Sequence, residues 1–310
     1  MALQQNGRAL VVAAGLAVIG LAAGCATSTG SSSGSSGGHV VRVVAAENFW
    51  GSLAGQLGGS HAQLTSIIVN PNADPHAYEP TAGDARTMAA AQLAVINGIG
   101  YDTWASKLVA ANPVSGRTVI TVGDVVGVAA GGNPHRWYSP TNVRQVIDAI
   151  TAAYKRLDPA DAGYFDGQHR AVLSVNLKDY FHLVTQIKTK YAGTPVGASE
   201  SIFTPLAQAL GLRLLTPESF LDAISEGADP TAADKTLIDR QIQTRQIKVY
   251  VYNSQNATPD VQAQVNAARH QGLQIATVTE TLTPARATFQ NWQVRQLLAL
   301  QQALANATGR

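Results

Sequence analysis

The stretch Asn70–Thr81, NPNADPHAYEPT, carries the strongest signal for the fold. It lies between an apolar run, Ala62–Val69, which predicts a buried strand, and a helix-like segment, Ala82–Gln92. Its three prolines fix φ in the loop and bias the residues before them toward extended backbone. Ligand sites of α/β proteins lie outside the carboxyl ends of strands, so this loop is placed to hold one imidazole, that of His76, at a fixed point.

A second loop repeats this pattern. Asn133–Pro140 reads NPHRWYSP, so His135, like His76, follows a proline and precedes an aromatic residue and another proline. On spacing alone, a proline-stiffened surface loop with an incidental histidine is the simpler interpretation of either stretch. Because the same pattern occurs twice, we favour the interpretation that the two histidines belong to one functional site.

Short apolar runs alternate with helical patterns along residues 39–310, which predicts parallel βαβ units. The expected strands are Val40–Ala46, Ala62–Val69, Leu93–Asn97, Thr118–Val122, Thr194–Ser199, Leu212–Leu215, Lys248–Tyr252 and Gln274–Val278. The expected helices include Asn48–Leu57, Thr141–Leu157, Ile202–Leu210, Thr231–Gln243, Pro259–Gln271 and Ala287–Ala305.

One helical pattern is much longer than the others. Apolar residues step by four and three alternately and form a single stripe, at Leu173, Leu177, Tyr180, Val184, Ile187 and Tyr191. A continuous helix over Asp161–Lys190 would be about 45 Å long. We therefore predict an α/β protein with two small parallel-sheet lobes, at 39–158 and 193–310, joined by one long backbone helix at 159–192.

The amino-terminal residues predict export. Arg8 precedes the apolar run Ala9–Ala23, which is shorter than the roughly 20 residues that a membrane span needs, and small residues follow. The sequence Leu21–Cys25, LAAGC, resembles a bacterial lipobox, in which the cysteine is lipidated. Cys25 is the only cysteine, so lipidation explains it better than packing or a disulfide does. An ordinary cleaved secretory signal with a coincidental cysteine is the less favoured alternative.

We accordingly predict a lipoprotein signal peptide at 1–24, followed by the lipidated cysteine and a flexible Ser/Gly tether at 25–38. The expected location is the cell envelope, with the chain anchored by lipid to the outer face of the cytoplasmic membrane. Charged residues make up 14% of the chain and the net charge is +2, without a long basic run. This composition argues against nucleic acid as a partner.

Together these features resemble the metal-binding solute-binding lipoproteins of ABC importers, the cluster A-I group that delivers zinc, manganese or iron. The resemblance covers essentially the whole mature chain, and the loops DPHAYEPT around His76 and NPHRWYSP around His135 carry most of it. It implies a parallel α/β lobe in each half, a long helix as the backbone and a metal in the cleft between the lobes. It also implies a monomer that docks on the permease subunits of an ABC importer.

The resemblance further implies four metal ligands, two from each half. His76 and His135 match the first pair. The third family ligand is a histidine or glutamate just before a helix that closes with Gly-Leu, and counting back from Gly211-Leu212 places Glu200 there. The fourth is usually an aspartate in the loop after the last strand, where this chain has Glu280, one methylene longer.

Two imidazoles and two carboxylates form a site richer in oxygen than a cysteine-based zinc site. In the family, glutamate as third ligand tends toward manganese, and many zinc members carry a His-rich loop before the second histidine. The equivalent stretch here, Asp124–Gly132, has no histidine. Both features favour Mn²⁺ or Fe²⁺, whereas the general affinity order favours Zn²⁺ over Mn²⁺. We expect one such divalent ion as the transported ligand.

Other polar residues are secondary candidates. Glu79 is a candidate to accept a hydrogen bond from a ligand histidine or from loop amides, and Asp74 is a candidate to do the same or simply to cap the turn. Glu226 is a weaker candidate for the fourth acid. His61 is expected to be solvent-exposed in a turn.

Three functions stay open on the sequence. The first is a transport receptor that captures a metal between two lobes and passes it to a permease. The second is a secreted metallohydrolase that uses His76, His135 and a carboxylate as ligands. The third is a surface adhesin in which the metal is only stabilising. No HExxH helix occurs, and four protein ligands leave little room for a substrate, so we expect a receptor rather than an enzyme.

Overall fold

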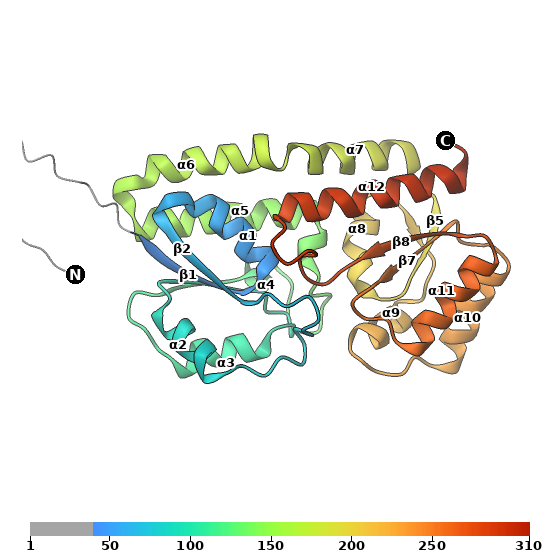
Figure 1. Cartoon of the computed structure of the whole chain (residues 1–310), viewed down its shortest axis with the longest axis horizontal. Helices are drawn as coiled ribbons and strands as arrows, with labels where there is room; N and C mark the ends of the chain where they lie inside the picture. Colours follow the sequence, from blue (N-terminus) through green and yellow to red (C-terminus); the bar gives the residue numbers. More distant parts are fainter. Residues whose placement is uncertain (1–39) are drawn as a thin grey trace, which may run out of the picture. The chain divides into compact units, whose positions relative to one another are not determined.

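The computed structural model describes residues 40–310, which belong to one compact unit (Figure 1). The predicted signal peptide at 1–24, the lipidation site Cys25 and the tether at 25–38 lie outside the described residues. Within the described residues, no helix combines the length and the apolar character that crossing a membrane requires.

The N-terminal lobe is a parallel α/β unit. Its strands are β1 (Val41–Glu47), β2 (Ala62–Ile68), β3 (Leu93–Ile96) and β4 (Thr118–Thr121), in the order β2-β1-β3-β4. Its helices are α1 (Asn48–Gly58), η1 (Gly59–His61), α2 (Ala82–Ala90), α3 (Thr103–Ala111), α4 (Val122–Val126), η2 (Arg136–Tyr138) and α5 (Pro140–Leu157). Strand β3, LAVI, is buried at every position because helices cover both faces of the sheet, with α1 and α5 on one side and α2 and α3 on the other (Figure 1).

The C-terminal lobe repeats this arrangement. Its strands are β5 (Pro195–Ala198), β6 (Arg213–Leu214), β7 (Val249–Asn253) and β8 (Gln274–Val278), in the order β6-β5-β7-β8, and all pairs are parallel. Its helices are η5 (Ser201–Phe203), α8 (Thr204–Ala209), α9 (Glu218–Ser225), α10 (Ala232–Gln243), α11 (Pro259–His270) and α12 (Phe289–Thr308). The predicted fold class, two parallel-sheet α/β lobes, is confirmed.

The segment between the lobes is helical but not one uninterrupted helix. It consists of η3 (Pro159–Asp161), α6 (Ala162–Ala171), the π turn η4 (Val172–Asn176) and α7 (Lys178–Tyr191). In the π turn the Leu177 N–H donates to the carbonyl of Val172, five residues earlier, at 2.9 Å. The buried stripe therefore steps by five there, from Val172 to Leu177, so Val172 is buried instead of the expected Leu173.

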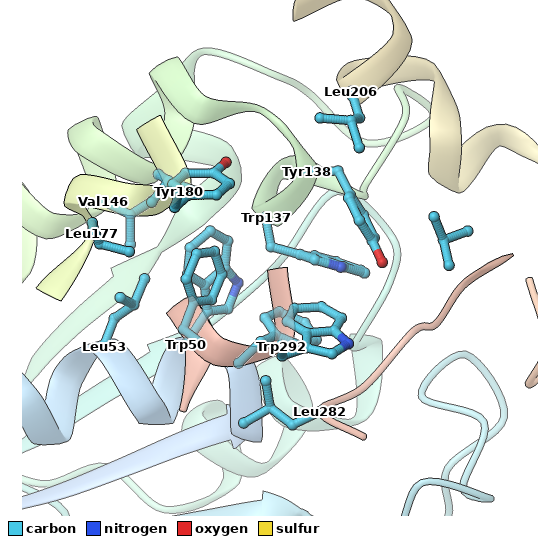
Figure 2. Close-up of a cluster of buried hydrophobic side chains, with 14 of the residues drawn as sticks. Trp50, Leu53, Trp137, Tyr138, Val146, Leu177, Tyr180, Leu206, Leu282 and Trp292 are labelled. Carbon is cyan, nitrogen blue, oxygen red and sulfur yellow. The ribbon is translucent and has the colours of Figure 1, made fainter. Parts of the chain in front are cut away.

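A cluster of aromatic side chains joins the cores of the two lobes (Figure 2). Phe49 of α1 stacks on Trp137 of η2 with ring centroids 4.0 Å apart, and Tyr138 packs on Trp292 of α12 at 5.7 Å. These four side chains are almost completely buried, and the same apolar core runs on into the strands of both sheets. The lobes are therefore held together by packing as well as by the chain that connects them.

Candidate metal centre

The loop after β2 holds His76 in a fixed position. Asp74 Oδ1 accepts a hydrogen bond from the His76 N–H at 2.9 Å, which closes an Asx turn across Pro75. Trp104 of α3 donates from Nε1 to the carbonyl of Pro75 at 3.1 Å, and the ring of Tyr101 meets the imidazole edge-on, 4.6 Å away. His76 Nε2 is buried and has no hydrogen-bond partner. Burial lowers the pKa of His76, so its imidazole is neutral and has a nitrogen available for a ligand.

The second loop holds His135 by the same device, and here the side chain is completely buried. Asn133 Oδ1 accepts from the His135 N–H at 3.0 Å and lies 3.0 Å from His135 Nδ1. Asn133 Nδ2 in turn donates to the carbonyl of Ser201 at 2.7 Å, which fixes the orientation of its amide. An amide oxygen only accepts, so Nδ1 carries the proton and the lone pair is on Nε2, which has no hydrogen-bond partner. Burial lowers the pKa of His135 to about 4.

Glu200 follows β5 and is 1% exposed. Its Oε2 accepts from Asn256 Nδ2 at 2.9 Å, whereas its Oε1 is buried without a partner. Burial, reinforced by the nearby charge of Glu280, raises the pKa of Glu200 to about 7. Without a cation, this carboxylate therefore tends to keep its proton.

Glu280 follows β8 and is contacted from both lobes. Its Oε2 accepts from the hydroxyl of Tyr101 at 2.9 Å, and its Oε1 accepts from Asn253 Nδ2 at 3.2 Å. The same Oε1 lies 3.4 Å from His135 Nε2. Burial raises the pKa of Glu280 to about 7. Because Tyr101 follows β3 and Glu280 follows β8, the carboxyl ends of the two sheets meet here.

The four predicted ligands converge on one cleft but do not form a compact coordination sphere. The two imidazoles meet edge-on with centroids 6.3 Å apart, and His135–Glu280 is the one imidazole–carboxylate pair among these four side chains that lies within 4.0 Å. No three of these described residues offer ligand atoms that all lie within 4.8 Å of one another. The carboxylates are instead hydrogen-bonded to Tyr101 and to amide groups. The four ligand groups therefore have to move closer together to bind one cation, and an ionised carboxylate has lone pairs enough to keep a hydrogen bond while it binds the cation.

Two hollows open beside the ligands. One, of about 350 Å³, is lined by residues that include His76, Glu218, Asp222 and Glu226, and the other, of about 420 Å³, by residues that include His76, Glu226 and Glu280. Glu226, the weaker candidate for the fourth acid, thus lines both hollows. Acidic side chains at the walls of a cleft attract cations toward it.

The secondary candidates differ in their surroundings. Asp74 binds the backbone of the His76 loop rather than the imidazole. Glu79 is exposed, and within the described part of the chain it forms no hydrogen bond with either histidine. The acceptor for a ligand histidine, which sequence reasoning did not identify, is Asn133. The available signal was that an Asp or Asn followed by Pro precedes each histidine, as DPH at 74–76 and NPH at 133–135.

Sequence reasoning also missed two residues, Asn97 and Asp102, that position the His135 loop and the partner of Glu280, Tyr101. Asn97 Nδ2 donates to the carbonyl of Pro134 at 3.0 Å, and both oxygens of Asp102 accept from backbone N–H groups, of Asn97 and Gly98, each at 2.7 Å. These hydrogen bonds order the loop that carries Tyr101. The bond from Asn97 to Pro134 joins residues 37 positions apart, so no local sequence pattern predicts it.

Comparison with known proteins places the chain among metal-binding proteins. The family model of the periplasmic zinc-uptake complex component A, ZnuA, matches residues 43–303. The chain is 26% identical to the manganese-binding lipoprotein MntA of Halalkalibacterium halodurans over 170 residues, 52% of this chain and 55% of MntA. It is 30% identical to the iron-binding protein YfeA of Yersinia pestis over 125 residues, 38% of this chain and 40% of YfeA. The matches thus span about half the length of these curated relatives or less.

Solved structures share the fold over a larger part of the chain. A manganese-bound periplasmic metal-binding protein from Candidatus Liberibacter asiaticus aligns with a TM-score of 0.69 and 21% identity, over 85% of this chain and 99% of that one. A crystal structure of ZnuA aligns with a TM-score of 0.68 and 20% identity, over 86% of this chain and 99% of that one. At this level of identity the likeness shows the fold alone.

Proposed function

Since the chain belongs to the family of the periplasmic zinc-uptake complex component A, ZnuA, we propose that it captures a divalent transition metal outside the cytoplasm and delivers it to an ABC importer. The ligands we propose are His76, His135, Glu200 and Glu280. Anchoring through a lipid on Cys25 and docking on permease subunits belong to the same proposal, which the name of MntA as a lipoprotein supports.

One observation carries this proposal: three of the proposed ligand atoms are buried and have no hydrogen-bond partner, namely His76 Nε2, His135 Nε2 and Glu200 Oε1. Buried polar atoms in folded proteins are almost always hydrogen-bonded, so three unpaired atoms around one cleft need an explanation. A divalent cation supplies it, because both imidazoles are neutral and each offers a lone pair. Two carboxylates then balance the charge of the ion once they have lost their protons.

The donor set favours a hard cation. Two glutamates and two imidazoles are compatible with Mn²⁺, Fe²⁺ and Zn²⁺, and the carboxylates can bind through one or two oxygens. We propose Mn²⁺ as the preferred cargo, with Zn²⁺ as a tighter competitor in vitro. The metallohydrolase alternative loses support because the matched family and the named relatives are metal-binding and metal-uptake proteins.

The test is calorimetric titration of the metal-stripped full-length chain with Mn²⁺. We expect one equivalent to bind at the cleft, and the variants His135→Ala and Glu200→Gln to weaken this binding at least about a hundredfold, because each removes a ligand or its charge. His182→Ala is the matched control, since His182 is exposed on α7. Wild-type affinity in both cleft variants, or no stoichiometric Mn²⁺ binding at all, would refute the proposal.

A further inference from the structure

A second group of ligand-type side chains lies at the other end of the N-terminal lobe. His61 ends η1 directly before β2, whereas His76 follows that strand. Strand β2 has seven residues and is roughly 20 Å long, and it lies between His61 and the loop that carries His76. Asp158 follows α5, and Asp161 ends η3 at the start of the segment that connects the lobes. His61, Asp158 and Asp161 are therefore independent of the cleft.

The distances among these three side chains fit one small cation. His61 Nδ1 lies 3.1 Å from Asp161 Oδ2 and 3.8 Å from Asp158 Oδ2, and all three ligand atoms lie within 4.8 Å of one another. Zn²⁺ binds imidazole nitrogen and carboxylate oxygen at about 2.0 to 2.2 Å, which places neighbouring ligands of a tetrahedron about 3.4 Å apart. The observed separations lie on either side of this value. Among the described residues, this is the one group of three His, Cys, Asp or Glu side chains that is this compact.

Two of the three ligand atoms are buried and unpaired. Asp158 is only 5% exposed, and its Oδ2 has no hydrogen-bond partner. His61 Nδ1 also has none, because its 3.1 Å contact with Asp161 lacks hydrogen-bond geometry. A buried carboxylate oxygen without a donor is unfavourable, and a second carboxylate close by adds repulsion. A cation between the three side chains removes both costs.

The imidazole of His61 is held in place by its neighbours. It packs against Tyr164 with ring centroids 4.1 Å apart and meets Phe165 edge-on at 5.8 Å. The hydroxyl of Tyr164 accepts hydrogen bonds from the Ser60 N–H at 3.1 Å and from Gln168 Nε2 at 2.7 Å. The ring is thus oriented by packing, as a ligand in a specific metal site needs to be. His61 is not the freely exposed turn residue that the sequence suggests.

We propose that His61, Asp158 and Asp161 form a second metal site, which takes Zn²⁺ with water in the remaining position and has a structural role. Asp161 is the most exposed of the three, at 36%, so water can reach the ion on that side. The bound ion joins the start of β2 to η3, the start of the connecting segment. It stabilises the lobe and takes no part in delivery of the cargo.

The experiment separates the two sites by using a full-length chain whose cleft is disabled. The variant His76→Ala/His135→Ala removes both cleft imidazoles and leaves the second site untouched. We expect this variant to bind one equivalent of Zn²⁺ in calorimetric titration, and Zn²⁺ to raise its Tm by several degrees. Adding Asp158→Asn, which keeps the shape but removes the charge, should abolish both effects. If that variant does not fold, Asp161→Asn at the exposed edge gives the same test.

A matched control is available on α6, in the connecting segment. His169 Nε2 lies 2.7 Å from Asp148 Oδ1 in an exposed pair without a third ligand, so His169→Ala should leave Zn²⁺ binding unchanged. The proposal is overturned if the cleft-disabled chain binds no Zn²⁺, because the trio would then be a contact between side chains without a metal. It is also overturned if Asp158→Asn or Asp161→Asn retains the bound ion. Both outcomes are independent of Mn²⁺ binding at the cleft, which the titration of the intact chain measures.

Discussion

Replacing Asn133 by alanine tests whether the cleft is organised by residues that cannot themselves bind a metal. Asn133 Oδ1 accepts from the His135 N–H and from the ring Nδ1, both at 3.0 Å. Its removal leaves two donors unpaired around a completely buried imidazole. The ring is then free to move its proton to Nε2, the nitrogen that must be deprotonated to bind a cation. Loss of such a partner typically weakens metal binding 10- to 100-fold, or about 1.4 to 2.7 kcal/mol.

The assay is a competition titration of Mn²⁺ against a chelating dye, with wild type and variant compared at one pH. Asn133→Asp separates the two roles of the residue, because it keeps an oxygen for the imidazole but loses the N–H that bonds the carbonyl of Ser201. Asn112→Ala is the control, since Asn112 Nδ2 bonds only the end of its own helix, at the carbonyl of Leu108. An Asn133→Ala variant that binds Mn²⁺ within twofold of wild type would refute the reasoning.

The burial of the site and of the core leads to three further predictions. Burial raises the pKa of Glu200 and of Glu280 to about 7, whereas an unperturbed glutamate in the unfolded chain has a pKa of about 4.3. The proton on each carboxyl group therefore stabilises the cation-free fold. This stabilisation is fully present below about pH 4.3 and is lost as the pH rises through 7. Calorimetry should therefore show a lower Tm at pH 8 than at pH 6 without Mn²⁺, together with tighter Mn²⁺ binding at pH 8; a flat profile would contradict this. Tyr101→Phe removes the hydroxyl that stabilises ionised Glu280. The Mn²⁺ affinity should therefore fall about tenfold at pH 6 and by less at pH 8. An equal loss of affinity at the two pH values would contradict this explanation. Trp137→Ala should lower the free energy of unfolding by about 3 to 5 kcal/mol in urea denaturation, whereas Val175→Ala, at an exposed position, should change it by less than about 0.5 kcal/mol.

The layout of the fold was predictable from the sequence because it depends on local periodicity. All eight expected strands occur, and β8 has the predicted bounds, Gln274–Val278. The interruption of the connecting helix was not predictable, because a π turn adds one residue without disturbing the hydrophobic pattern at either side of it. Helices α3 and α9 were also missed, since nine and eight residues are too few to show a long apolar stripe.

The candidate site was predictable only in part, for a related reason. The two histidines stand in loops whose proline pattern is visible in the sequence, whereas Glu200 and Glu280 were assigned by family resemblance. The hydrogen-bond partners of the two glutamates come from distant parts of the chain. The hydrogen bond between Tyr101 and Glu280, for example, joins residues 179 positions apart. Pairing over such a distance depends on how the two lobes meet, which no window of sequence records.

The shared aromatic cluster also limits how the chain can be recombined. A fragment that ends before β5 would keep Phe49 and Trp137 but lose Trp292, and would leave a large apolar surface in water. Neither lobe is thus an independent module, although each has a complete sheet of its own. Chimeras that exchange one lobe between relatives would have to carry matching aromatic residues across the junction, so the two halves of the chain are constrained to change together.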